Sequence, residues 1–222
     1  MVGVFEKLFG SDARSARAAL VQSVERELGH VRPFYAAALV DVPRECFVRP
    51  GDEGRAAEDI PLPLDDTGRA TISAPHAYVL SFDLAELAPG DTLLELGAGT
   101  GYGAALAAHI VGETGRVTTI EIDPSLAARA RTLLANYANV TLLEGDALHM
   151  PGAWAGMQKA ICTFSIARIP QEWMEAIPNG GVLVAPVGPP NRTQNLVRAR
   201  RTNDELVTTV HGTVRYVPSR SS

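Results

Sequence analysis

The sequence predicts an α/β fold with a mostly parallel sheet of strands and helices on both of its faces. Short apolar, β-branched runs alternate with helix-like stretches between residues 92 and 187. A glycine-rich run at 97–103 follows one of these strands, as it does where a parallel strand delivers a nucleotide-type ligand to a helix N-terminus. The last two runs form a hairpin pattern around Asn203-Asp204, which predicts an antiparallel strand at the end of the sheet.

Length and composition indicate one ordinary globular domain. The chain has 222 residues, of which 46% are hydrophobic and 20% are charged. The net charge of −5 disfavours nucleic acid as the main partner, because a phosphate backbone favours a basic surface. No run approaches the roughly 18 apolar residues of a membrane span, so no membrane partner is expected.

The two cysteines suggest neither a metal site nor a disulfide framework. Cys46 and Cys162 are far apart in the chain, and no histidine pair lies near either. Cys162 stands in an apolar run and is expected in the core. Residues 1–10 are too short and too charged for a signal peptide. We therefore expect a cytoplasmic protein without a metal.

The N-terminal part divides into helices and a segment rich in proline and glycine. Apolar spacing predicts helices at 11–29 and 33–40. Residues 41–72 mix prolines, glycines and charges, so few regular elements are expected there. The segment also carries Phe47, Val48, Ile60, Leu62 and Leu64, so we expect it to pack as a loop over a binding cleft; the alternative is a surface linker.

The remaining elements follow in regular alternation. Helices are expected at 75–88, 102–111, 123–136 and 170–177. Strands are expected at 92–96, 117–122, 140–144, 160–164 and 182–187, with the terminal hairpin at 195–201 and 207–216.

The glycines alone do not identify the ligand. The dinucleotide fingerprint GxGxxG accepts alanine at its third place. Counted from Gly97 that place is Tyr102, which fails, and counted from Gly99 it is Ala104, which is permitted. A dinucleotide therefore stays possible at this point.

Three acids at successive strand ends narrow the ligand. Glu121 is placed to accept both ribose hydroxyls, Asp146 to meet an adenine amino group, and Glu95 to hold a cationic amine. A ligand with positive charge and without phosphate suits three acids and no phosphate-binding lysine, and S-adenosylmethionine is such a ligand. The alternatives are a solvated strand-end acid for Glu121, a helix cap for Asp146 and an acid that only caps loop amides for Glu95.

Several motifs point to one family. They are Val42-Pro43-Arg44-Glu45-x-Phe47-Val48, Asp59-x-x-Leu62-Pro63-Leu64, Ala70-Thr71-Ile72-Ser73-Ala74-Pro75-His76, the glycine run, Gly180-Gly181-x-Leu183-Val184-x-Pro186-Val187-Gly188 and Val214-Arg215-Tyr216-Val217-Pro218. With these motifs the chain resembles the protein-L-isoaspartate (D-aspartate) O-methyltransferases over most of its length. The Thr-Ile-Ser-x-Pro segment is the specific part, because many methyltransferases share the glycine motif.

The resemblance implies a Rossmann-like methyltransferase sheet of seven strands with the last hairpin inserted antiparallel. It implies a single domain, 1–222, with N-terminal helices and an acceptor-side loop in 1–74 and a cofactor-binding core in 75–222. It also implies methylation of the α-carboxylate of L-isoaspartyl residues in damaged proteins by a monomer that uses S-adenosyl-L-methionine.

The resemblance further assigns residues to the site. Ser73 is expected where cofactor and acceptor meet, either orienting the acceptor carboxylate or only capping a helix. His76 is expected to line the site or to be structural. The full set expected to bind the cofactor is Ile72, Ser73, Pro75, His76, Glu95, Gly97, Ala98, Gly99, Thr100, Gly101, Tyr102, Glu121, Ile122, Gly145, Asp146, Ala147 and Thr163.

The chain departs from the family pattern at three places. Arg69-Ala70 stands where many members have Gly-Gln before Thr-Ile-Ser, and Gln158 stands where Asp is usual. The acceptor-side run, often Thr-Ala-Ala-Ala-Pro, is here Thr163-Phe164-Ser165-Ile166-Ala167-Arg168.

Four functions follow from this pattern. The first is isoaspartyl repair methylation. The second is methylation of another carboxylate, for instance an Asp of a peptide precursor. The third is cofactor binding without turnover. The fourth is NAD-dependent oxidation, which leaves Asp146, Glu95 and the Thr71-Ile72-Ser73 segment unexplained.

Overall fold

A seven-stranded sheet forms the centre of the computed structural model, which describes residues 2–203 and 205–220. The strand order is β5-β4-β3-β6-β7-β8-β9. The first five strands in this order run parallel, and β8 and β9 continue the sheet as an antiparallel pair. The bounds are β3 (Thr92–Leu96), β4 (Arg116–Glu121), β5 (Val140–Glu144), β6 (Lys159–Cys162), β7 (Val182–Val187), β8 (Gln194–Thr202) and β9 (Glu205–Val214). The predicted fold class is confirmed.

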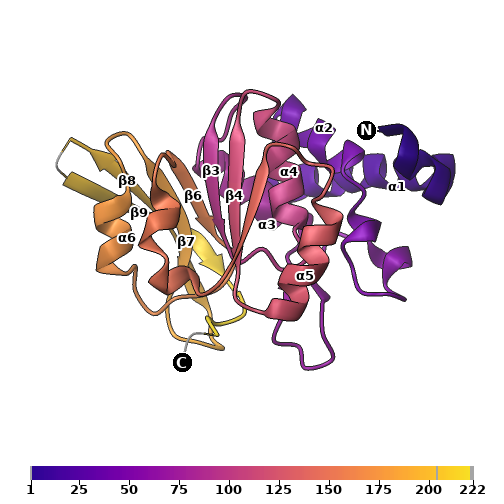
Figure 1. Ribbon diagram of the computed structural model, residues 1–222. Helices are drawn as coiled ribbons and strands as arrows, with labels where there is room; N and C mark the ends of the chain where they lie inside the picture. The colour runs from indigo at the N-terminus through magenta and orange to yellow at the C-terminus, as the bar shows by residue number, and fades with distance from the viewer. Residues whose placement is uncertain (1, 204, 221–222) are drawn as a thin grey trace.

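Helices cover both faces of this sheet (Figure 1). One face carries α1 (Val2–Leu28), α2 (Pro33–Asp41), α3 (Pro75–Leu84), α4 (Tyr102–Val111) and α5 (Pro124–Leu133). The other carries α6 (Gln171–Ala176) and the short turns η3 (Ala147–His149) and η4 (Pro151–Trp154). Strand residues alternate between the two cores: Leu93 packs under the larger helical layer, whereas Leu94 and Leu96 pack toward α6.

Several boundaries differ from the expectations. Helix α1 begins at Val2 rather than at residue 11. Helix α3 ends at Leu84 rather than near 88, because Glu86 adopts a positive φ of 56° that no helix continues through. The terminal hairpin joins the sheet antiparallel, as expected: β8 pairs with β7, and β9 is the edge strand.

The proline-rich segment packs, as expected. It holds the turns η1 (Arg44–Cys46) and η2 (Glu53–Arg55) and a small antiparallel pair of β1 (Leu62–Pro63) and β2 (Thr71–Ile72). Phe47, Val48, Leu62 and Leu64 are buried, so the segment is no surface linker.

One buried arginine organises the segment. The guanidinium of Arg44, which is fully buried, donates to the carbonyl oxygens of Ala56 (3.0 Å), Glu58 (2.8 Å), Ile60 (2.8 Å) and Ser73 (3.1 Å). Carbonyl groups in a loop lack the backbone hydrogen bonds that a sheet or helix would give them. The single side chain of Arg44 satisfies several of these acceptors. Burial lowers the pKa of Arg44.

Three further findings concern possible partners. Among the described residues, no helix combines the length and the apolar character that crossing a bilayer requires. The same part of the chain contains no group of three or more potential metal-binding side chains. Cys162 is buried as expected, and neither it nor Cys46 forms a disulfide.

Candidate functional site

A cavity opens at the carboxyl ends of the parallel strands, where open α/β sheets bind ligands. The space between its walls, counted out into open solvent, is about 570 Å³. The sheet side contributes the glycine loop and residues that follow β4, β5 and β6, namely Gly97, Gly99, Ile120, Glu121, Ile122, Gly145, Asp146, Ala147, Thr163 and Phe164. The covering side contributes Arg69, Ala70, Thr71, Val217, Pro218, Ser219 and Arg220, and Leu126 of α5 also lines the cavity.

The glycine loop needs its glycines for geometry. Gly97, Gly99 and Gly101 have φ values of 98°, 57° and 94°, in the region that side chains disfavour. A Cβ on Gly97 would lie 2.4 Å from Thr163 Oγ1, and one on Gly101 would lie 2.8 Å from a Leu134 methyl carbon. The loop therefore turns tightly against β6 and presents the start of α4 to the cavity.

Glu121 is a buried acid on the cavity wall. Its carboxylate accepts hydrogen bonds from the backbone amides of Gly99 (2.6 Å) and Asp123 (2.9 Å). Burial raises its pKa. Each carboxylate oxygen has a second acceptor site, so the group can also accept from two hydroxyls. At 6% exposure, it is not a solvated strand-end acid.

Asp146 has a similar place at the end of β5. Its Oδ1 accepts from Leu148 N at 2.9 Å and caps η3, so the helix-cap alternative describes one of its roles. The residue also lines the cavity between Gly145 and Ala147. The carboxylates of Glu121 and Asp146 thus stand at neighbouring strand ends beside the glycine loop.

Glu95 does not reach the cavity. It shares the face of Leu93, which α4 covers, and its Oε2 accepts from Thr119 Oγ1 at 2.7 Å. A Cβ on Gly103 would lie 1.9 Å from its other oxygen. Burial raises the pKa of Glu95 to about 8. The predicted contact to a cofactor amine is not supported by this arrangement, in which Glu95 sits behind the loop.

A smaller chamber adjoins the cavity along the same loop. Both are lined by Thr71, Gly97, Gly99 and Thr163, and the chamber adds Leu64, Ile72, Tyr78, Ala98, Thr100 and Tyr102. Thr100 Oγ1 donates to Phe47 O at 2.7 Å, which ties the loop to the proline-rich segment. Of the expected cofactor-binding residues, twelve line one chamber or the other.

The other expected residues are not among those that line the two chambers. Ser73 is buried, with 8% of its surface exposed. The N-cap residue of α3 is Ala74, so Ser73 does not cap this helix. His76 pairs with Asp59: its amide and its Nδ1 contact Asp59 Oδ1 at 2.9 and 3.1 Å. This hydrogen bond raises the pKa of His76, and the arrangement matches the structural alternative. Pro75 opens α3, and Gly101 caps α4.

The C-terminal arm of the covering side, residues 217–220, was absent from the sequence-based site. The arm is held by Ser165, whose amide donates to Val217 O (2.8 Å) and whose carbonyl accepts from Ser219 N (3.0 Å). Val217 and Pro218 belong to a motif of the resemblance, which gave them no role in the site.

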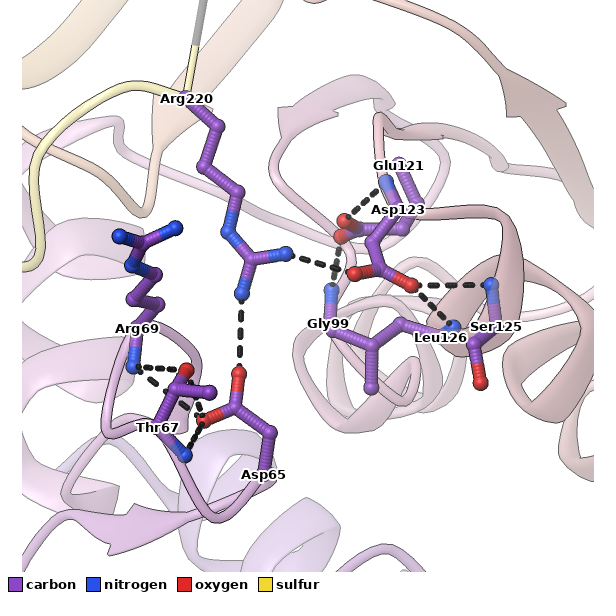
Figure 2. Close-up of polar contacts among 9 residues, drawn as sticks. All are labelled: Asp65, Thr67, Arg69, Gly99, Glu121, Asp123, Ser125, Leu126 and Arg220. Carbon is purple, nitrogen blue, oxygen red and sulfur yellow. Dashed lines mark hydrogen bonds and ion pairs between the residues drawn. The ribbon is translucent and has the colours of Figure 1, made fainter.

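Arg220 ties three distant segments together (Figure 2). Its Nη1 lies 2.7 Å from Asp123 Oδ2, and its Nη2 lies 3.1 Å from Asp65 Oδ2. The partners are 97 and 155 residues away in the chain, so no local pattern signals the contact. The tie holds the arm against both the loop at Asp65 and the start of α5.

The family model for protein-L-isoaspartate (D-aspartate) O-methyltransferases matches residues 15–222. The chain belongs to this family. A protein-L-isoaspartate O-methyltransferase of Ignicoccus hospitalis is 40% identical over 84% of this chain and 89% of its own. One of Archaeoglobus fulgidus is 36% identical over 94% of each chain.

Solved structures agree on the fold. A protein-L-isoaspartate O-methyltransferase matches with a TM-score of 0.82 and 26% identity, over 92% of this chain and 66% of that one. A candidate member from Plasmodium falciparum, solved with S-adenosyl-L-homocysteine, matches with a TM-score of 0.79 and 17% identity, over 92% of this chain and 98% of that one.

The bulky residues that depart from the family's acceptor-side run occupy different places. Ile166 is 4% exposed and bridges to Val187, so its side chain belongs to the core toward α6. Phe164 lines the cavity beside Gly97, where a Cβ would lie 2.9 Å from its ring. Of the two, only Phe164 contributes to the cavity wall.

Proposed function

We propose that this protein transfers the methyl group of S-adenosyl-L-methionine to the α-carboxylate of L-isoaspartyl residues in proteins. Membership of the family supports this reaction. The observation that carries the proposal is the pair of carboxylates, Glu121 and Asp146, at adjacent strand ends of a cavity bounded by the glycine loop.

The cavity fits this cofactor in its donor set. Glu121 has acceptor sites for two ribose hydroxyls, and Asp146 is placed to accept from an adenine amino group. No lysine lines either chamber within the described chain, as suits a ligand without phosphate. The proposed contacts are Ile72, Gly97, Ala98, Gly99, Thr100, Tyr102, Glu121, Ile122, Gly145, Asp146, Ala147 and Thr163.

The protein's own part in the reaction is positioning. When bound, S-adenosylmethionine supplies a methyl group on a positively charged sulfur. An acceptor carboxylate is already ionised near neutral pH, so the protein needs no strong general base. Its residues hold the carboxylate in line and exclude water. We assign Ser73, next to the chamber residue Ile72, to donating a hydrogen bond that orients this carboxylate.

The proposed setting follows the composition. A net charge of −5 supports a protein or peptide acceptor rather than nucleic acid. Two unpaired cysteines support the cytoplasm, where disulfides are rare. We propose that the protein acts there as a monomer.

A pair of peptides tests the proposal. We expect labelled methyl transfer to an isoaspartyl peptide and none to its aspartyl twin. Label on neither peptide would contradict repair activity. Calorimetry with S-adenosylhomocysteine would then separate methylation of another carboxylate, with binding retained, from loss of the cofactor site.

A serine substitution tests the assigned role. Ser73→Ala should slow methyl transfer about tenfold, the effect of losing one hydrogen bond of about 1.4 kcal/mol. Ser23→Ala is the matched control, because Ser23 lies on α1 and its hydroxyl accepts a hydrogen bond from Arg26. A full rate in Ser73→Ala would remove Ser73 from the mechanism.

A further inference from the structure

An arginine on the covering side of the cavity carries a charge that no acid neutralises. The exposed side chain of Arg69 lines the cavity together with Arg220. Within residues 2–203 and 205–220, the Arg69 guanidinium makes no hydrogen bond or ion pair, and Figure 2 draws none to it. Arg220, the other cation on this wall, pairs with two aspartates.

The backbone around Arg69 is nevertheless fixed. Asp65 Oδ1 accepts from Thr67 N (2.9 Å), Thr67 Oγ1 (2.8 Å) and Arg69 N (3.2 Å), which closes a turn over residues 65–69. The second oxygen of Asp65 binds Arg220 at 3.1 Å. The acid nearest in sequence to Arg69 therefore has both oxygens engaged, and the turn holds the Arg69 side chain at the cavity.

The other acids of the site are also engaged. Glu121 accepts two backbone amides, Asp123 binds Arg220 and caps α5, and Asp146 caps η3. A guanidinium that keeps its donors free at a cavity wall is complementary to a ligand carboxylate, which it can bind through two parallel hydrogen bonds.

We propose that Arg69 binds the carboxylate of the acceptor peptide and thereby determines acceptor specificity. The inference rests on the proposed function, in which the acceptor is a carboxylate. The position supports the acceptor over the cofactor. Arg69 lies on the same segment as Ser73, which is assigned to orient the acceptor, whereas Glu121, proposed for the cofactor, lies on the opposite wall. Many members of the family have Gly-Gln where this chain has Arg69-Ala70, so the proposal concerns a cation that those members lack at this position.

Binding measurements test the proposal independently of turnover. The probes are an isoaspartyl peptide and the same peptide with its α-carboxylate replaced by a carboxamide, titrated in the presence of S-adenosylhomocysteine. The unmodified protein should prefer the carboxylate peptide. Arg69→Gln should weaken that peptide about tenfold and leave the carboxamide peptide unchanged, and Arg69→Lys should lie between. In turnover, Arg69→Gln should raise KM and leave kcat within about twofold.

Controls separate the other outcomes. Arg26→Gln removes the same charge from α1, away from the cavity, and should change neither affinity. Equal weakening of both peptides, or no weakening, overturns the proposal. A third outcome would assign Arg69 to the carboxylate of the cofactor instead. In that case, Arg69→Gln would weaken binding of S-adenosylhomocysteine but not of 5′-methylthioadenosine, which lacks the amino-acid part. If the unmodified protein binds the peptide without methylating it, the proposed function fails while the binding comparison still decides the role of Arg69.

Discussion

The two sides of the cavity are held together in different ways. On the sheet side, the glycine loop and Glu121 are fixed by backbone hydrogen bonds, such as those from Gly97 N and Ala98 N to Ile120 O. On the covering side, single charged side chains join segments far apart in sequence, with Arg44 at its base and Arg220 at its rim. The sheet wall is therefore fixed by the sheet itself, whereas the covering wall depends on a few individual residues.

Among the variants that test this contrast, substitution of Arg44 should have the largest effect, a loss of folding stability. Arg44→Met should lower the free energy of unfolding by about 3–5 kcal/mol, because it leaves four buried carbonyl oxygens without their donor. Urea unfolding measures it. Arg55→Met, in the same segment with an exposed side chain, should change stability by less than about 0.5 kcal/mol. Equal stability of the two variants would show that Arg44 does not hold the cover.

The buried carboxyl of Glu95, behind the glycine loop, should make the stability of the protein depend on pH. Its pKa is about 8 in the folded protein against an ordinary 4.5, so the folded state retains a proton that the unfolded chain releases. Stability from this group is therefore present at low pH and lost as pH rises between these values. Glutamine does not titrate, so Glu95→Gln should not lose this stability as pH rises. The difference in free energy of unfolding between the variant and wild type should therefore shift in favour of the variant by roughly 3 kcal/mol from about pH 5 to about pH 8.

A strand-end acid provides the control for Glu95. Glu144→Gln changes an exposed carboxyl paired with Arg131 and should run parallel to wild type over the same range. Unfolding curves at several pH values give the comparison. Parallel profiles for Glu95→Gln and wild type would mean that Glu95 is charged in the folded protein.

Glu121 tests the sheet side as a cofactor wall. Glu121→Ala should weaken S-adenosylhomocysteine by about 1–3 kcal/mol in calorimetry, because it removes hydrogen bonds to a charged acceptor. Glu144→Ala is the matched control, since Glu144 pairs with Glu121 in register on the next strand but does not line the cavity. Unchanged affinity in Glu121→Ala would refute its assignment to the ribose.

Substitution of Arg220 should have the smallest effect, on the affinity for S-adenosylhomocysteine. Its two ion pairs are partly exposed, so Arg220→Gln should weaken S-adenosylhomocysteine by only about 1 kcal/mol, and less at high salt. Arg200→Gln breaks a comparable pair with Glu86 away from the cavity and should have no such effect. If the loss of S-adenosylhomocysteine affinity does not change with salt, the ion pairs of Arg220 do not act through their charges.

The same contrast explains what the sequence could predict. The strands Thr92–Leu96, Val140–Glu144 and Val182–Val187 were predicted to the residue, because apolar runs between turn residues are local signals. Glu121 and Asp146 were placed at the cavity by the rule that parallel strands end at one edge.

Other features had no local signal. A fully buried strand does not reveal in its pattern which face a single residue occupies, so the sequence did not show that Glu95 is buried away from the cavity lining. Arg220 and the free charge of Arg69 depend on contacts across 97 to 155 residues.

Asp65 and Asp123 each divide their two oxygens between a local and a distant partner. In both, Oδ1 accepts amides of its own turn or helix, Thr67 for Asp65 and Ser125 for Asp123, while Oδ2 binds Arg220. Releasing Arg220 thus costs neither the turn nor α5 its own hydrogen bonds. The backbone hydrogen bonds of Ser165 still hold Val217 and Ser219 when Arg220 is released. Opening at this rim is therefore expected to be a motion of the Arg220 side chain, on the order of picoseconds to nanoseconds.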